Sequence, residues 1–164
     1  MSPSPEQAEY ASLLLRRAKG DLEACRVLVD NADIDDNIVG FHAQQAVEKA
    51  LKVVLVLQGA DLPLSHDLKF LVREVRESGV EPSDKLMDAQ WLTPWAAELR
   101  YDEPVALDRP EALAVADNAV TWAESLLTGA TSTKAQASGL SKTNPAEPDP
   151  TPATTGNPTL PDPL

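Results

Sequence analysis

The segment FHAQQAVEKALKVVLVLQG, residues 41–59, decides the fold class of this chain. Its apolar residues recur at intervals of three and four, which is the period of an α-helix, and no turn signal interrupts them before Gly59. We expect the apolar arc to face a core; its members are Val39, Ala43, Ala46, Val47, Ala50, Val54 and Leu57. The β-branched run at 53–56 continues the helical pattern and therefore does not predict a strand.

Four polar residues of the same segment lie nearly opposite the apolar arc. His42, Gln45, Lys49 and Lys52 are spaced by three, four and three residues, and we call them the polar stripe. A hydrated surface is the ordinary explanation for such a stripe. The stripe also predicts a local anion-binding strip, because it places two lysines, an amide and an imidazole in line. It fits a helix–helix contact in a dimer equally well, because Gln44 and Gln45 can donate and accept hydrogen bonds across such a contact. The sequence leaves these three interpretations open.

The rest of the first 128 residues predicts four more helices. Amphipathic stretches cover residues 5–31, 66–78, 84–100 and 108–127. Asp35 or Asp36 is the expected cap of the helix that contains residues 41–58. Ser65, Ser83 and Asp108 are the expected caps of the last three stretches. Gly79 should end the third helix in the left-handed region, and Pro94 should start a new turn or kink the fourth near Leu92. The prediction is an all-α, antiparallel up-and-down bundle of about five helices over residues 6–128.

The remaining residues, 129–164, have a different composition. Seven of the fourteen prolines fall in the last twenty positions, and Thr, Ser and Ala dominate the segment. So few large apolar side chains cannot offset the conformational entropy of ordering the chain. We therefore expect a disordered Pro/Thr-rich C-terminal tail.

Composition excludes several classes of function. A formal net charge of −12 repels nucleic acid at long range, so general DNA or RNA binding through bulk charge is excluded, although a local basic patch can still bind a phosphate. The single Cys25 rules out a disulfide framework and a thiolate zinc site, and no HxxxH or HExxH motif occurs. We expect no metal, no cofactor and no membrane segment, and we interpret the chain as cytoplasmic.

Three segments in order resemble the HEPN domain family: FHAQQAVEKALKVVLVLQG at 41–59, LSHDLKFLV at 64–72 and LTPWAAELRYDEP at 92–104. The resemblance implies an antiparallel bundle of about five helices, often a homodimer, commonly encoded with a minimal nucleotidyltransferase partner. Several branches of this family are metal-independent ribonucleases or toxins of toxin–antitoxin pairs. Other members bind nucleotides without cutting RNA.

The ribonuclease branches carry an Arg followed four to six residues later by a His. Arg100 matches this Arg, but the chain continues YDEPVALD, and neither His42 nor His66 follows an Arg at that spacing. We therefore predict a HEPN protein without the ribonuclease motif that binds a nucleotide or a nucleotidyltransferase, within a toxin–antitoxin pair. The expected ligand contacts are His42, Gln45, Lys49, Lys52, Arg100 and Tyr101.

Two alternatives belong to other classes of protein. One is a metal-independent ribonuclease that uses Arg100 with a non-adjacent histidine, His42 or His66, because an imidazole can move a proton near neutral pH while a guanidinium steadies a phosphate. The other is a purely structural module that dimerises through the polar stripe.

Overall fold

The computed structural model describes residues 3–96 and 106–139, and within these ranges every regular element is helical. The elements are α1 (Pro5–Leu28), α2 (Asp36–Leu57), α3 (Leu68–Glu77), α4 (Asp84–Met87), the 3-10 helix η1 (Ala89–Ala96) and α5 (Arg109–Gly139). This confirms the predicted all-α class. None of the helices in the described ranges combines the length and apolarity needed to cross a bilayer.

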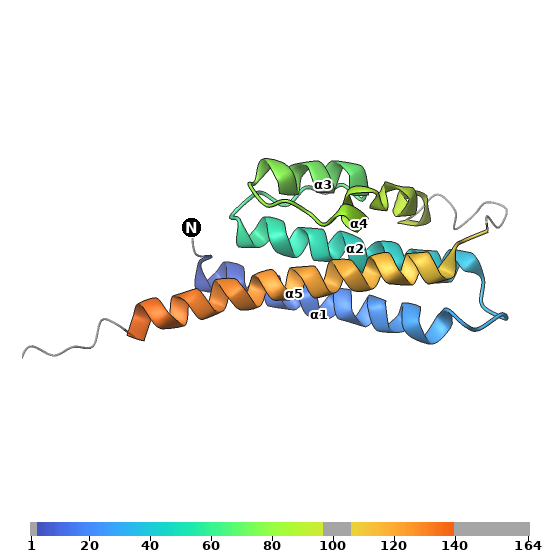
Figure 1. Ribbon diagram of the computed structural model, residues 1–164, viewed down its shortest axis with the longest axis horizontal. Coiled ribbons are helices and arrows are strands. Elements are labelled where there is room, and N and C mark those ends of the chain that lie inside the picture. The colour runs from blue at the N-terminus through green and yellow to red at the C-terminus, as the bar shows by residue number, and fades with distance from the viewer. Residues whose placement is uncertain (1–2, 97–105, 140–164) are drawn as a thin grey trace, which may run out of the picture.

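Helix α2 is the central element of the bundle. It lies beside the long rods α1 and α5, and the shorter α3, α4 and η1 lie on its other side (Figure 1). The predicted apolar arc of α2 is buried throughout, as expected. Leu51, Val53, Leu55 and Val56 are buried as well, and every residue from 39 to 57 is at least partly buried. A helix surrounded in this way keeps only a small part of its surface in contact with water.

Capping residues begin the long helices where the sequence predicted. The Asp35 carboxylate accepts a hydrogen bond from the backbone N–H of Asn37 at 3.0 Å, and the Asp108 carboxylate accepts one from Glu111 at 3.0 Å. Helix α1 begins with a reciprocal capping box between Ser4 and Gln7. These bonds satisfy backbone donors that the first turn of a helix leaves free.

The start of α3 differs from the prediction. Asp67, not Ser65, is its cap, because the Asp67 carboxylate accepts from the backbone N–H of Lys69 at 2.9 Å. The Ser65 hydroxyl accepts from the N–H of Asp67 at 3.1 Å and so shapes the loop before the helix. The predicted inward residues Leu68, Leu71, Val72 and Val75 are buried, and Gly79 has the expected left-handed backbone, with φ 91°.

Two further boundaries were predicted wrongly. The fourth helix is not continuous: it breaks after Met87, and Pro94 lies inside the 3-10 helix that follows. The Ser83 side chain makes no capping bond and instead donates to Asn118 on α5 at 2.5 Å. The last helix does not end near Leu127 but continues to Gly139, so the first eleven residues of the expected disordered tail are helical. The rest of that tail, residues 140–164, lies outside the described ranges.

Arg109 fastens the start of α5 to the end of α1. Its guanidinium donates to the backbone carbonyls of Leu28, Val29, Asn31 and Ile34, and to the Asp36 carboxylate at 2.5 Å. The last carbonyls of a helix have no partner within the helix, so a five-donor side chain is well suited to this place. Burial raises the pKa of Asp36, but bonds from the Leu107 backbone and from Arg109 outweigh it and leave the pKa lowered.

Gly40 allows α2 and η1 to approach closely. A Cβ atom at this position would lie 2.5 Å from the indole ring of Trp95, which is only 4% exposed. The ring is held in the core and cannot move aside without opening a gap. We therefore predict that Gly40→Ala lowers the free energy of unfolding by about 1–3 kcal/mol, the usual cost of overpacking a core, as measured by urea denaturation.

Gly20→Ala is the matched control for this substitution. Gly20 also lies inside a helix, α1, but no atom lies within 4 Å of the added Cβ. Alanine there should raise the free energy of unfolding by about 0.5–1 kcal/mol because glycine is the weaker helix former. Equal stabilisation by both substitutions would contradict the close contact of Gly40 with Trp95.

Candidate functional site

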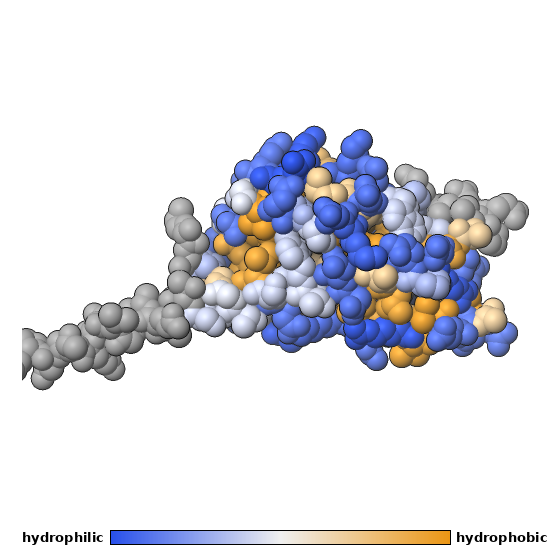
Figure 2. All heavy atoms as spheres, viewed as in Figure 1, coloured by the Kyte–Doolittle hydropathy of each residue, from blue (hydrophilic) through white to orange (hydrophobic). Residues whose placement is uncertain are grey.

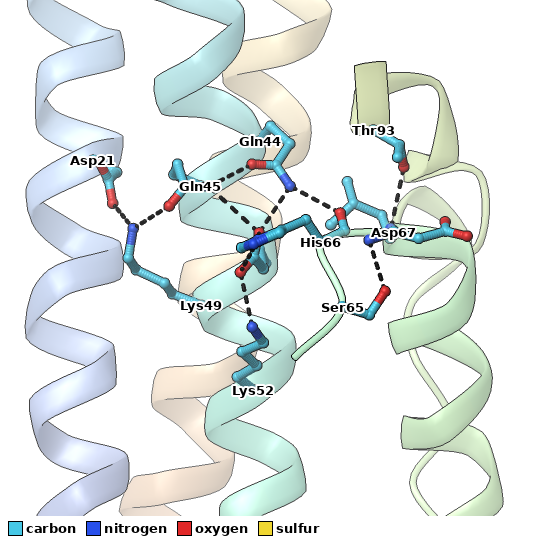
Figure 3. A network of polar contacts seen from close by, with 11 residues as sticks. Asp21, Gln44, Gln45, Lys49, Lys52, Ser65, His66, Asp67 and Thr93 are labelled. Atoms are coloured by element: carbon cyan, nitrogen blue, oxygen red, sulfur yellow. Dashed lines mark hydrogen bonds and ion pairs between the residues drawn. The ribbon is translucent and has the colours of Figure 1, made fainter. Parts of the chain in front are cut away.

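Polar side chains of α1, α2 and the loop before α3 form one connected cluster, shown in part in Figure 3. We call it the polar network; its members are Asp21, His42, Gln44, Gln45, Glu48, Lys49, Lys52 and His66. Six of the eight come from consecutive turns of α2. The network therefore runs along the central helix and reaches a neighbour on each side.

On the side of α1, Asp21 binds two members of the polar stripe. Its Oδ2 accepts from the Lys49 ammonium at 2.6 Å, and its Oδ1 lies 3.0 Å from His42 Nδ1. Lys49 also donates to Gln45 Oε1 at 2.8 Å. The Asp21 side chain is 17% exposed and that of Lys49 is 21% exposed, so this ion pair lies at the edge of the core. Charge-assisted bonds in such a place are stronger than those at an open surface.

On the side of α3, Glu48 is the centre of the network. Its carboxylate, 5% exposed, accepts from Lys52 at 2.9 Å and from the amide of Gln44 at 3.0 Å. His66 Nδ1 lies 3.0 and 3.1 Å from the two carboxylate oxygens. Gln44, which is fully buried, also donates to the backbone carbonyl of His66 at 3.2 Å, so the loop residue is held at two points.

The surroundings of Glu48 keep it ionised. Burial raises the pKa of this carboxyl, but the bonds from Lys52, Gln44 and His66 together outweigh burial and hold the pKa below its usual value of 4.5. An ionised carboxylate only accepts hydrogen bonds, so His66 must donate through Nδ1–H. In the neutral ring the other nitrogen, Nε2, is then free of a proton, and the His66 side chain is 64% exposed. In this arrangement Nε2 is able to accept a hydrogen bond or a proton from a molecule in solvent.

The polar stripe does not form the hydrated face that periodicity suggested. His42, Lys49 and Lys52 are 27%, 21% and 15% exposed, and each bonds an acid of the same chain. Gln45 bonds Gln44 and Lys49. The stripe is partly covered because α1 and the loop before α3 pack over it, which leaves little surface there for a second copy. Arg100 and Tyr101, the other expected ligand contacts, lie outside the described residues.

The sequence interpretation did not identify Asp21, and it did not recognise Glu48 as the centre of the network. Both carry a signal in their spacing. Asp21 lies three residues after Ala18 and four before Cys25, on the buried face of α1. Glu48 belongs to a second buried row of α2, formed by Gln44, Glu48, Leu51 and Leu55 at intervals of four, three and four. An acid within an apolar row indicates a buried partner.

Comparison with known proteins places this bundle in a family. The family model of the HEPN domain matches residues 11–128. The chain belongs to the HEPN domain family. It is 42% identical over 116 residues to a Methanocaldococcus jannaschii protein named "Putative toxin MJ1304", with 63% of this chain and 71% of that protein covered. No solved structure matches the chain.

Neither histidine of this HEPN bundle follows an arginine at the spacing of the ribonuclease motif. His42 faces Asp21 on α1, and His66 faces Glu48 at the start of α3. Among the described residues, no group of three or more His, Cys, Asp and Glu side chains is placed to hold a metal ion. Of the two imidazoles, only that of His66 is mostly exposed, so it is the stronger candidate for contact with a ligand.

Glu48 links the stability of the HEPN bundle to pH. Because its folded pKa lies below the unfolded value, its contribution is fully present above the unfolded pKa and is lost as pH falls through the folded pKa. Replacing Glu48 by Gln removes this charge from Lys52 and should lower the free energy of unfolding at pH 7 by about 3 kcal/mol. The loss should shrink as pH is lowered from about 5, as measured by urea denaturation at a series of pH values.

Glu77→Gln is the matched control, because Glu77 is 66% exposed and pairs with Arg73 at the surface. Its effect at pH 7 should stay within about 0.5 kcal/mol. If the loss on Glu48→Gln were the same at pH 7 and at pH 4, Glu48 would not be an ionised, stabilising group.

Proposed function

We propose that this HEPN protein is the toxin-type component of a toxin–antitoxin pair and that a nucleotidyltransferase-type protein is its partner. The similarity to the Methanocaldococcus jannaschii protein named as a toxin carries this proposal. The HEPN family model matches residues 11–128, which include the polar network. The partner and the toxic activity are parts of the proposal.

The proposed ligand is a nucleotide, and His66 is the network residue with the most room to touch it. The ammonium groups of Lys49 and Lys52 already bond Asp21 and Glu48, so a phosphate would have to displace a carboxylate to reach them. We therefore propose that these two lysines hold the network together, while His66 provides the exposed contact. Arg100 and Tyr101 stay candidate contacts, and a homodimer stays part of the proposal, with an interface away from the polar stripe.

Growth of a bacterial host tests the toxin proposal. Induced expression of the full chain should arrest growth at least tenfold in colony count, and co-expression of a nucleotidyltransferase encoded beside the gene should restore it. The partner should also co-purify with the full chain.

Two expression variants make this test specific. His66→Gln keeps a hydrogen-bonding group beside Glu48 and should relieve the arrest if His66 contacts the target. His42→Gln, which changes the other histidine, should still arrest growth. Normal growth with the well-folded wild-type chain at high expression would refute the toxin proposal.

A metal-independent ribonuclease is the second candidate, and the Glu48–His66 pair is the observation that favours it. Because Glu48 fixes Nδ1 as the donor, Nε2 is oriented as a base. That nitrogen would take the proton of a ribose 2′-OH as its oxygen attacks the adjacent phosphorus. The bond to the 5′-oxygen breaks, that oxygen takes up a proton, and the products are a 2′,3′-cyclic phosphate and a 5′-hydroxyl.

Cleavage of RNA in the presence of a chelator tests this candidate. Wild-type protein should cut single-stranded RNA to 2′,3′-cyclic phosphate ends, and His66→Gln should lower the rate by about 100-fold or more, the usual contribution of a general base. His42→Gln should keep the wild-type rate. Equal rates for both variants, or no cleavage by any of the three proteins, would rule out His66 as the base.

A further inference from the structure

A groove of about 380 Å³ runs along α3, directly after His66. Its lining includes Asp67, Lys69, Phe70, Arg73, Arg76 and Gln90. The outer edge of the molecule where α3 lies is mostly hydrophilic (Figures 1 and 2). The volume falls within the range of small-ligand sites. His66 precedes the first lining residue in sequence, and its imidazole faces Glu48 on α2.

Three cations of the groove form one row along α3. Lys69, Arg73 and Arg76 are spaced by four and three residues, so they lie on the same face of the helix, and all three are exposed. They span about 10 Å of helix axis, given a rise of 1.5 Å per residue. A stacked nucleic acid strand carries one phosphate per about 3.4 Å of axis, so the row is long enough to face two or three successive phosphates. This row stands out in a chain of net charge −12.

The present contacts of these three cations leave them available to bind an anionic ligand. Among the described residues, no acceptor lies within bonding distance of the Lys69 ammonium. Arg76 pairs with Glu81 at 3.2 Å, and Arg73 pairs with Glu74 at 3.2 Å and Glu77 at 3.6 Å. Exposed pairs of this kind contribute little and exchange readily with other anions. The Asp67 carboxylate is the opposing charge in the lining, and it is occupied as the cap of α3.

Phe70 orients the middle cation. The Arg73 guanidinium lies 4.8 Å from the centre of the Phe70 ring, a cation–π contact that holds the planar group over the aromatic face. A guanidinium held in this way offers its edge to phosphate oxygens and its outer face to a base, since proteins stack nucleic acid bases on arginine planes as well as on aromatic rings.

We propose that the groove along α3 is a binding site for the phosphate and base of a nucleotide, either free or within a single RNA strand. Lys69 and Arg76 contact phosphates, and Arg73 stacks on the base. The inference rests on the proposed function for the identity of the ligand, whereas the position of the site comes from the geometry of α3. It does not involve the residues of the ribonuclease motif or the polar stripe.

Binding by the full chain tests this site without any need for catalysis or toxicity. Fluorescence anisotropy with a labelled twelve-nucleotide single-stranded RNA and calorimetric titration with ATP separate the two sources of the nucleotide. Both are measured on wild-type protein in chelator and read binding alone, so that absence of the proposed toxin or ribonuclease activity cannot be confused with loss of binding.

The double variant Lys69→Ala/Arg76→Ala should weaken binding of whichever ligand is bound by at least tenfold. For RNA it should also reduce the slope of log affinity against log salt by about 1.4, the value for two lost phosphate contacts on a single strand. The matched control is Lys19→Ala/Arg26→Ala, which removes one lysine and one arginine of similar exposure from α1. Arg73→Lys, which keeps the charge but not the planar stack, should weaken binding by about fivefold or more.

Three results would overturn the proposal. These are equal weakening by the α3 and α1 double variants, unchanged binding by the α3 double variant with its unfolding midpoint intact, and no binding of either RNA or ATP by wild-type protein. RNA or ATP binding by wild-type protein that the α3 variants weaken and the α1 double variant does not supports it, even if neither growth arrest nor cleavage is found.

Discussion

The ionised carboxylate of Glu48, buried on the central helix, is the constraint on which the arrangement of this bundle depends. A charge taken out of water must be paired and fully hydrogen-bonded, because its desolvation is otherwise too costly. Helix α2 supplies two of the partners one turn away on either side, Gln44 and Lys52, and the third comes from His66. The path of the loop across α2, and with it the place where α3 begins, therefore follows from one acidic side chain.

Asp21 has the corresponding role on the other side of α2, where it fixes how α1 packs against this helix. The buried residues of α1 and α2 are mostly apolar, and apolar burial is not directional. A pairing of Asp21 with Lys49 and His42 has only one good register. The network thus adds specificity to a core whose stability comes from burial of apolar surface. The polar stripe, which the sequence suggested was a surface, is in the folded chain bonded to acids of the same chain.

The sequence predicted the positions of the helices well and the packing between them poorly, for a physical reason. Helical period and caps are local properties, so the apolar arc of α2, the caps Asp35 and Asp108, and the left-handed Gly79 were all predictable. Periodicity describes one helix at a time, and it could not show that neighbouring elements partly cover the polar stripe of α2. The end of α5 was missed because composition measures how much surface a segment can bury. It does not measure whether an Ala-rich segment continues a helix.

Arg109 has a consequence for the order in which the chain acquires its structure. It lies 81 residues after Leu28, and its guanidinium donates to the backbone carbonyls of Leu28, Val29 and Asn31 at the end of α1. While the protein is being synthesised, α1, α2 and α3 leave the ribosome well before that side chain exists. Until Arg109 and α5 have been made, the emerging chain lacks these bonds at the end of α1 and leaves a flank of α2 uncovered, so this is the stage at which a chaperone or an early-binding partner protein has most to protect.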